Sequence, residues 1–298
     1  MKQQEDFELT LFDRIEVIKQ TINKYGEDKF YISFSGGKDS TILHYLVDIA
    51  IPENKIPRVF IDTGIEYNAI REFVKNLALV DKRFQIIKPS QPIKEMLEKN
   101  GYPFKSKEHS VKVGMYQKGS RAKSVIAYKE GKGIFSCPNK LLYQFDKEFT
   151  LRLSSDCCTI LKKKPVNKWE KENNRHIAII GIRMQEGGQR KNHKGCIVLK
   201  GGKLTKFKPL NPVSNEFEEW FIEKFQIKLC KLYYPPYNFK RTGCKGCPFS
   251  LDLQDQLTAM QTYMPAERQQ CEIIWEKVYS EYRRIGYRLK KEEQIKLL

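Results

Sequence analysis

The residue types most able to do chemistry in this chain are gathered in one short segment, Ser35-Gly36-Gly37-Lys38-Asp39-Ser40. The apolar run Phe30–Phe34 precedes it, and apolar residues at helical spacing follow it at positions 42 to 49. This pattern predicts a strand, a glycine turn and a helix. Two glycines let the backbone come close to a ligand, and a helix start offers unpaired N–H groups and the positive end of the helix dipole. Such a turn binds anions, usually phosphate, and four side chains could add charge or hydroxyl donors: Lys38, Ser35, Ser40 and Thr41.

The spacing of the glycines distinguishes between kinds of phosphate loop. A Walker A loop needs four residues between its first glycine and its Gly-Lys pair, whereas Gly36 and Gly37 are adjacent. The segment resembles instead the SGGxDS signature of the PP-loop, or N-type, ATP pyrophosphatase superfamily, whose members cleave ATP between the α- and β-phosphates. A structural glycine turn before a helix is the alternative, but six matching residues between a strand and a helix favour the phosphate site.

Cysteines form a second group of candidate ligands. Cys157 and Cys158 are adjacent, and Cys244 and Cys247 form a C-x-x-C pair. Four thiolates can bind Zn²⁺ or a [4Fe–4S] cluster. The adjacent pair favours the cluster, because separate irons can take neighbouring thiolates, whereas a zinc site must aim two thiolates at one small ion. Zinc, and four buried thiols without a metal, are the alternatives.

Strand and helix patterns alternate along much of the chain. This alternation predicts an α/β fold with a parallel twisted sheet and helices on both faces. Ligands of such sheets bind at the carboxyl ends of the strands, where Ser35 and Asp62 fall. A tight hairpin is predicted at Gly201-Gly202. The predicted strands are 30–34, 57–62, 84–87, 175–183, 196–199 and 204–207, and the predicted helices include 9–22, 42–49, 67–77, 93–97, 217–225 (capped by Ser214 or Asn215) and a long helix after Pro265.

These patterns divide the 298-residue chain into four predicted segments. Residues 1–100 would be the first part of a nucleotide-binding core and 101–150 a basic insertion. Residues 151–230 would complete the core and carry the first cysteine loop, and 231–298 would hold the C-x-x-C loop and a helical C-terminal part that carries the four-cysteine site.

The predicted insertion has an excess of positive charge. Between 105 and 133, eight basic residues accompany Glu108 and Glu130, with aromatic residues interleaved. This composition fits either a solvated, partly helical insertion or a surface that tracks a nucleic-acid backbone with aromatics available for stacking. The basic residues are Lys105, Lys107, Lys112, Lys118, Arg121, Lys123, Lys129 and Lys132, and the aromatic residues are Tyr102, Phe104, Tyr116 and Tyr128.

The overall charge and the N-terminus limit the class of protein. A net charge of +18 suggests a polyanionic partner. The first residues are polar, without the apolar region of a secretory signal, and no apolar run approaches membrane-spanning length. We therefore expect a cytoplasmic protein with no membrane partner. In that compartment eight cysteines indicate metal, cluster or redox chemistry rather than a disulfide framework.

Further motifs, in their order along the chain, resemble the phosphoadenosine-phosphosulfate reductase family of the PP-loop superfamily. Asp62-Thr63-Gly64 is similar to the family's second-strand element beside the nucleotide. Gly181-Ile182-Arg183, followed by Glu186 and Arg190, is similar to the segment whose arginines meet phosphate or sulfate. The segment 209–212 before a tryptophan-containing helix resembles the family's proline-leucine segment. The resemblance implies an adenine nucleotide α-hydrolase-like, Rossmann-like fold.

The cysteine pattern resembles adenylyl-sulfate reductases and the iron–sulfur members of the superfamily that act in DNA phosphorothioation. Two departures separate the chain from the reductases. They usually have an eroded phosphate loop and a catalytic cysteine near the C-terminus, whereas this chain keeps SGGKDS and has no cysteine after Cys271. The resemblance therefore implies thiolation chemistry, with DNA or RNA as the acceptor and an unknown protein as the sulfur donor. A sulfonucleotide reductase and a non-catalytic nucleic-acid-binding regulator are the alternatives.

The resemblance also implies a role for each candidate residue. The loop Ser35–Thr41 would hold the β- and γ-phosphates of ATP–Mg²⁺, with Asp39 or Asp62 helping to place the metal. Lys38, Arg183 and Arg190 would stabilise charge during transfer. A [4Fe–4S] cluster would bind Cys157, Cys158, Cys244 and Cys247. The predicted nucleotide contacts are Ser35, Gly36, Gly37, Lys38, Asp39, Ser40, Thr41, Asp62, Thr63, Gly64, Gly181 and Arg183.

Overall fold

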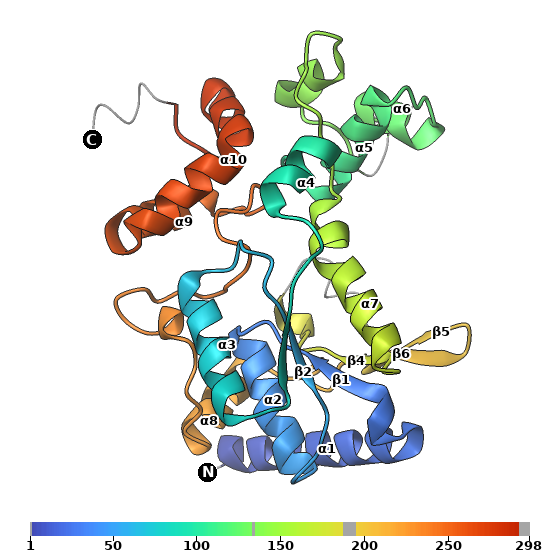
Figure 1. Cartoon of the computed structure of the whole chain (residues 1–298), viewed down its shortest axis with the longest axis vertical. Helices are drawn as coiled ribbons and strands as arrows, with labels where there is room; N and C mark the ends of the chain where they lie inside the picture. The colour runs from blue at the N-terminus through green and yellow to red at the C-terminus, as the bar shows by residue number, and fades with distance from the viewer. Residues whose placement is uncertain (1, 133–134, 187–194, 292–298) are drawn as a thin grey trace. The chain divides into compact units, whose positions relative to one another are not determined.

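The computed structural model describes residues 2–132, 135–186 and 195–291 (Figure 1). The chain forms two compact units. The first contains Met1–Asp62, Tyr67–Ile87 and Val166–Thr242, and the second contains Thr63–Glu66, Lys88–Pro165 and Gly243–Leu298. Apart from the short stretch Thr63–Glu66, the chain changes units near residues 87, 165 and 242, whereas the predicted segments change at 100, 150 and 230.

The first unit is built on a six-stranded sheet with the order β3-β2-β1-β4-β6-β5. Neighbouring strands from β3 to β6 run parallel, and β5 pairs antiparallel with β6 at the edge. The predicted α/β class is therefore confirmed, as is the hairpin, in which Gly201 and Gly202 have φ values of 57° and 75°. The strands are β1 (Phe30–Ser33), β2 (Arg58–Ile61), β3 (Phe84–Ile87), β4 (Ile177–Ile179), β5 (Ile197–Lys200) and β6 (Lys203–Phe207).

Strand β4 ends earlier than the sequence predicts. The prediction of a strand over 175–183 is wrong beyond Ile179. A Cβ atom on Gly181 would lie only 2.9 Å from the carbonyl oxygen of Asp39, so this glycine lets the backbone pass against the start of α2 (Lys38–Ala50). The residues after β4 are therefore used to approach the phosphate turn rather than to extend the sheet.

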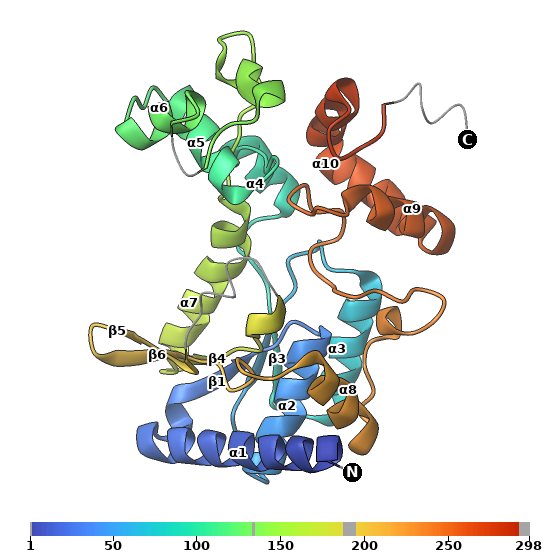
Figure 2. The same cartoon turned by 180° about the vertical axis from the view of Figure 1, so that it is seen from behind.

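The two faces of the sheet are covered by different helices (Figures 1 and 2). Because successive strand residues point to opposite faces, Tyr31 packs with Val59, Ala178 and Trp169 of α7 (Lys164–Glu172), while its neighbours point the other way. On the other face, Phe34 contacts Phe84 and His44 of α2, with ring centroids 5.0 and 6.4 Å apart. This unit also contains α1 (Lys2–Tyr25), α3 (Asn68–Val80) and α8 (Asn215–Lys224). The predicted cap of α8 is confirmed, because the Phe217 amide donates a hydrogen bond to Ser214 Oγ.

The second unit is helical in its described part. It contains α4 (Ile93–Asn100), α5 (Lys107–Gln117), α6 (Lys123–Lys129), α9 (Leu253–Tyr263) and α10 (Pro265–Ile285). Its core brings Phe104 onto Tyr282, with ring centroids 4.4 Å apart. A π-helical turn, Thr159–Lys163, directly follows Cys157 and Cys158. Across the described ranges of both units, no helix has the length and apolar character required to cross a membrane.

Candidate nucleotide and cysteine sites

The glycine turn between β1 and α2 has the backbone shape that an anion site requires. Gly36 has a φ of 71°, and a Cβ atom there would lie 2.8 Å from Ile70 Cγ2, so only glycine fits without strain. Gly37 is the N-cap of α2. The hydroxyls of Ser40 and Thr41 donate to the Gly37 carbonyl at 2.9 and 3.0 Å, which fixes the turn against the helix. The backbone N–H groups at the start of α2 can then serve a ligand.

A cavity of about 290 Å³ opens on this turn. It brings together six of the predicted nucleotide-site residues: Ser35, Gly37, Lys38, Asp39, Ser40 and Gly181. Tyr233, Lys240, Arg241 and Thr242 also line it, and the sequence analysis did not assign them to the nucleotide. The Lys38 amide donates to the Tyr233 hydroxyl at 2.9 Å, and that hydroxyl lies 2.9 Å from Thr242 Oγ1.

A network of charges borders the cavity through Lys38 and Asp39, and its other members, Arg183 and Glu218, are buried. Arg183 Nε contacts Asp39 Oδ1 at 2.9 Å and Glu218 Oε1 at 2.8 Å, and Lys38 Nζ lies 3.0 Å from Glu218 Oε2. Asn215 Oδ1 accepts a further bond from Arg183 at 2.9 Å. Burial, followed by the nearby Asp39 carboxylate, raises the pKa of Glu218 to about 8. Glu218 therefore holds a proton in most molecules at neutral pH, although two cations lie against it.

The other predicted nucleotide residues are placed differently. Asp62 directly follows β2 and pairs with Arg71 at 2.9 Å, and it does not line the cavity. Thr63 and Gly64 belong to the second unit, where the Thr63 hydroxyl donates to Glu66 at 2.7 Å. Gly36, Thr41 and Arg183 support the turn from outside the cavity lining. Arg190 lies outside the described residues.

The four predicted cluster cysteines all lie in the second unit and are free thiols. The Cys157 thiol donates a hydrogen bond to the Cys158 sulfur, and this bond together with burial raises the pKa of Cys157. The same hydrogen bond lowers the pKa of Cys158 to about 5, with help from Lys107, Lys162 and Lys163. The charges on Cys244 and Cys247 also act on Cys157, so the set is electrostatically coupled.

A donor set of four thiols with lysines around it fits an anionic iron–sulfur cluster. Within the described ranges, no three Cys, His, Asp or Glu side chains are grouped closely enough to hold a metal ion. This finding bears equally on zinc and on a cluster, so both stay predictions.

Helix α10 holds the C-x-x-C turn in position. Gly246 has a φ of 60°, and a Cβ atom there would collide with the Tyr279 hydroxyl and lie 2.8 Å from Cys271 Sγ. Tyr279 donates to the Gly246 carbonyl, and Tyr282 donates to the Pro248 carbonyl at 2.8 Å. Cys271 itself is buried and its pKa is raised to about 12 by burial, which indicates a packing role.

The basic insertion differs in part from its prediction. Tyr102, Phe104 and Tyr128 are buried, so the expectation that they are available for stacking is wrong. Tyr116 is covered by Arg121, whose guanidinium lies 3.9 Å from the ring centroid. These three rings form part of the core of this unit and are not presented at its surface. Lys118, Arg121 and Lys123 are exposed, and Lys112 pairs with Glu108 at 3.5 Å.

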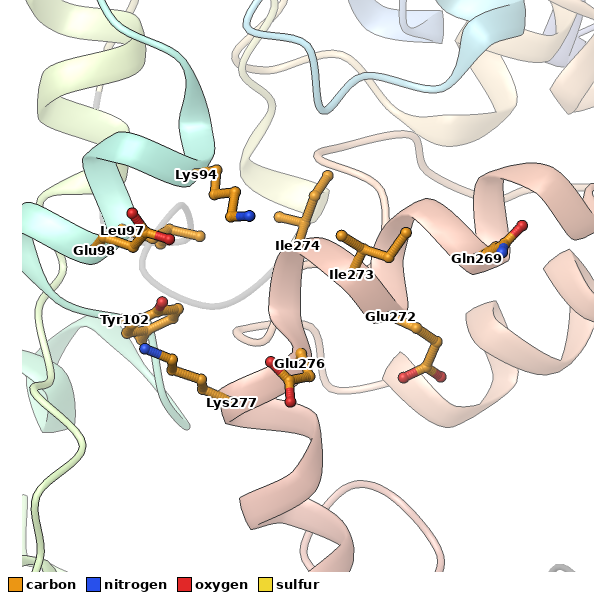
Figure 3. Close-up of a pocket in the computed structure, with 10 residues that line it drawn as sticks. All are labelled: Lys94, Leu97, Glu98, Tyr102, Gln269, Glu272, Ile273, Ile274, Glu276 and Lys277. Carbon is orange, nitrogen blue, oxygen red and sulfur yellow. The ribbon is translucent and has the colours of Figure 1, made fainter.

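A second cavity, of about 420 Å³, lies between α4 and α10 of the second unit (Figure 3). Its lining mixes apolar residues such as Leu97 and Ile274 with side chains of both charges, among them Lys94, Glu276 and Lys277. None of the predicted site residues lines it.

The fold is that of an α/β protein with a glycine turn of the anion-binding kind after β1, and comparison with known families specifies the class. Residues 29–132 and 123–250 match the phosphoadenosine phosphosulfate reductase domain. The match spans more than half of the chain, so the chain belongs to this family, as its sequence motifs predict. An uncharacterised protein of Methanocaldococcus jannaschii is 36% identical over 103 residues, which cover 31% of this chain and 25% of that relative. The chain thus matches about a quarter of the relative's length.

Several solved structures resemble the chain at 15% identity. The alignment with phosphoadenylyl-sulfate reductase from Candida auris covers 77% of this chain and 93% of the reductase chain, with a TM-score of 0.42. For FMN adenylyltransferase from Candida glabrata with FAD and inorganic pyrophosphate, the shares are 80% and 62% and the TM-score is 0.48. For the U34-tRNA thiolase NcsA from Methanococcus maripaludis with its [4Fe–4S] cluster, they are 91%, 79% and 0.40. Because all three TM-scores are below 0.5, the fold assignment rests on the strand order and the family match.

Proposed function

We propose that this protein is an ATP pyrophosphatase that adenylates a substrate and so prepares it for iron–sulfur-assisted sulfur transfer. One observation carries the proposal. The intact SGGKDS turn lines a single cavity through Ser35, Gly37, Lys38, Asp39 and Ser40, at the N-terminus of α2. The helix start and the lysine together favour a polyanion such as the triphosphate of ATP.

The reaction follows from the charges of the site. An oxygen of the substrate attacks the α-phosphorus of ATP, the bond to the bridging oxygen of the β-phosphate breaks, and pyrophosphate leaves with the negative charge. Lys38 neutralises part of that charge, and Arg183 keeps Asp39 oriented at the cavity. Mg²⁺ bound near Asp39, with Asp62 as the other candidate, would screen the phosphates during transfer.

The cysteine set supplies the second part of the proposal. Cys157, Cys158, Cys244 and Cys247 would hold a [4Fe–4S] cluster, which when bound would bind or relay sulfur. The lysines that lower the pKa of Cys158 favour an anionic ligand set there. Protein purified without oxygen is expected to be brown, with broad absorbance near about 400 nm and bound iron and sulfide. Stoichiometric zinc without iron would contradict the cluster.

The acceptor is proposed to be DNA or RNA, bound through the exposed cations Lys118, Arg121 and Lys123. Phosphate contacts release counterions, so affinity should fall steeply as salt is raised. A small sulfonucleotide is the second candidate, because the family is defined by a sulfonucleotide reductase domain. If no DNA or RNA binds at low salt, the sulfonucleotide becomes the favoured substrate.

The deciding experiment is pyrophosphate release from ATP by anaerobically purified protein, with and without DNA or tRNA. We expect AMP and pyrophosphate in equal amounts, stimulated by the acceptor. The Lys38→Ala variant should lose turnover, while Lys231→Ala, an exposed lysine outside the cavity, should keep it. Release of ADP and phosphate would show that the glycine turn has another function.

A further inference from the structure

The segment 231–242 contributes four residues to the phosphate cavity, and no sequence motif singled it out for that role. Tyr233, Lys240, Arg241 and Thr242 lie on it. The segment is anchored within the first unit, because the Phe239 ring lies 5.3 Å from that of Tyr67. The Phe239 amide also donates to the Leu232 carbonyl at 2.8 Å. Leu232 and Phe239 directly precede Tyr233 and Lys240 in sequence, so these contacts hold the segment beside the glycine turn.

The Tyr233 hydroxyl occupies a position that a phosphate oxygen would need. It accepts the bond from the Lys38 amide at 2.9 Å, and this is the first N–H after the N-cap of α2. A phosphate bound at a helix start accepts bonds from these same free N–H groups. Thr242 Oγ1, 2.9 Å from the tyrosine oxygen, completes the pair of hydroxyls. A ligand must therefore replace the tyrosine oxygen before it can bind this amide.

The charge balance of the cavity calls for more cations than the glycine turn supplies. Arg183 pairs with the Asp39 carboxylate at 2.9 Å, and the raised pKa of Glu218 leaves Lys38 largely uncompensated, so this network offers a ligand little more than the charge of Lys38. Pyrophosphate carries several negative charges, and moving them into a half-enclosed site without compensation is unfavourable. Lys240 and Arg241 are exposed, adjacent in sequence and part of the same cavity lining, so both positive charges border the space that the anion would enter.

We infer that Lys240 and Arg241 bind the pyrophosphate half of the nucleotide, and that the Tyr233 hydroxyl occupies the phosphate-binding amide until this group displaces it. The inference rests on the proposed function and extends it to residues beyond the SGGKDS turn. It predicts effects of opposite sign for two kinds of substitution in one segment. General damage to the fold would weaken binding in both.

The test is calorimetric titration of the full chain with inorganic pyrophosphate, AMP and adenosine 5′-phosphosulfate. The Lys240→Ala/Arg241→Ala double variant should bind pyrophosphate at least about tenfold more weakly, because charge-assisted bonds are lost, with AMP affinity unchanged. Tyr233→Phe should bind pyrophosphate about two- to tenfold more tightly, because the competing hydroxyl is gone. Lys231→Ala removes one charge outside the cavity and serves as the matched control.

Three results would overturn the inference. They are a double variant that binds pyrophosphate as the Lys231→Ala control does, a Tyr233→Phe variant that binds it equally or more weakly, and losses confined to adenosine 5′-phosphosulfate. Failure of the proposed function gives a different pattern. In that case pyrophosphate binding would respond as predicted, but ATP would release no pyrophosphate.

Discussion

Two charged networks lie at the two ends of helix α2, and each combines two carboxyl groups with two cations. Near the C-terminal end, Asp48 pairs with Arg58 and Arg83, and Arg83 also pairs with Asp81. At the N-terminal end, Asp39 and Glu218 contact Arg183, and Glu218 also contacts Lys38. The two networks have equal numbers of acidic and basic side chains, and the second borders the cavity at the glycine turn through Lys38 and Asp39.

The networks differ in how completely their carboxyl groups are ionised. Burial alone would raise the pKa of Asp48, but hydrogen bonds from Arg83 and the charge of Arg58 lower it. In the second network, burial and Asp39 raise the pKa of Glu218 to about 8. A carboxyl group that keeps its proton beside two cations leaves them part of their charge for an anionic ligand. This difference separates a network that stabilises the fold from one suited to a binding site.

The largest expected effect comes from removing the arginine of the cavity network. Arg183→Met should lower ATP-dependent pyrophosphate release by about 100- to 1000-fold, because Asp39 loses its orienting partner and the site loses a charge. The free energy of unfolding should be affected less than turnover, since Glu218 already carries a proton and does not become an isolated buried anion. Turnover and urea unfolding measured on the same preparation test both statements. Near-normal turnover would remove Arg183 from the proposed mechanism.

The opposite pattern is expected at the other end of α2. Arg58 is fully buried and donates to His44, Asn54 and the Ile56 carbonyl as well as pairing with Asp48. Arg58→Met should lower the free energy of unfolding by about 3 kcal/mol, because these buried acceptors lose their donor. Nucleotide affinity of the folded protein should not change. Arg83→Met is the matched control, with a smaller loss expected because Arg83 is partly exposed and solvent screens its ion pairs. Equal losses would contradict the distinction.

The sequence predicted the glycine turn but neither network, and the reason is the range of the interactions. The turn, the cap at Ser214 and the hairpin at Gly201-Gly202 depend on neighbouring residues, so local patterns identify them. Lys38 and Tyr233, in contrast, are 195 residues apart and meet only through the fold. Arg58 lies inside a segment that the apolar pattern identified only as a strand. Glu218 is one of several glutamates at the start of a helix, where the helix dipole favours acidic residues. The sequence alone therefore provided no reason to expect that it is buried.

A further expected effect is a difference in pH response between the two ends of α2. Burial and Arg58 lower the pKa of His44 to about 4 from its ordinary 6.5, so the unfolded chain binds the extra proton and this contribution to stability is lost as pH falls from 6.5 to 4. The pKa of Glu218 is raised from 4.5 to about 8, so its contribution is lost as pH rises across that range.

Urea unfolding between pH 4 and 8 should show that His44→Asn removes the loss of stability on the acid side, and that Glu218→Gln removes the loss on the alkaline side. Asn can still accept the bond that Arg58 donates to His44 Nδ1 at 3.0 Å, so the variant tests the titration rather than the contact. If either variant keeps the parent's pH slope in its own range, that group does not titrate as its surroundings require, and the contrast between the two networks fails at that end of the helix.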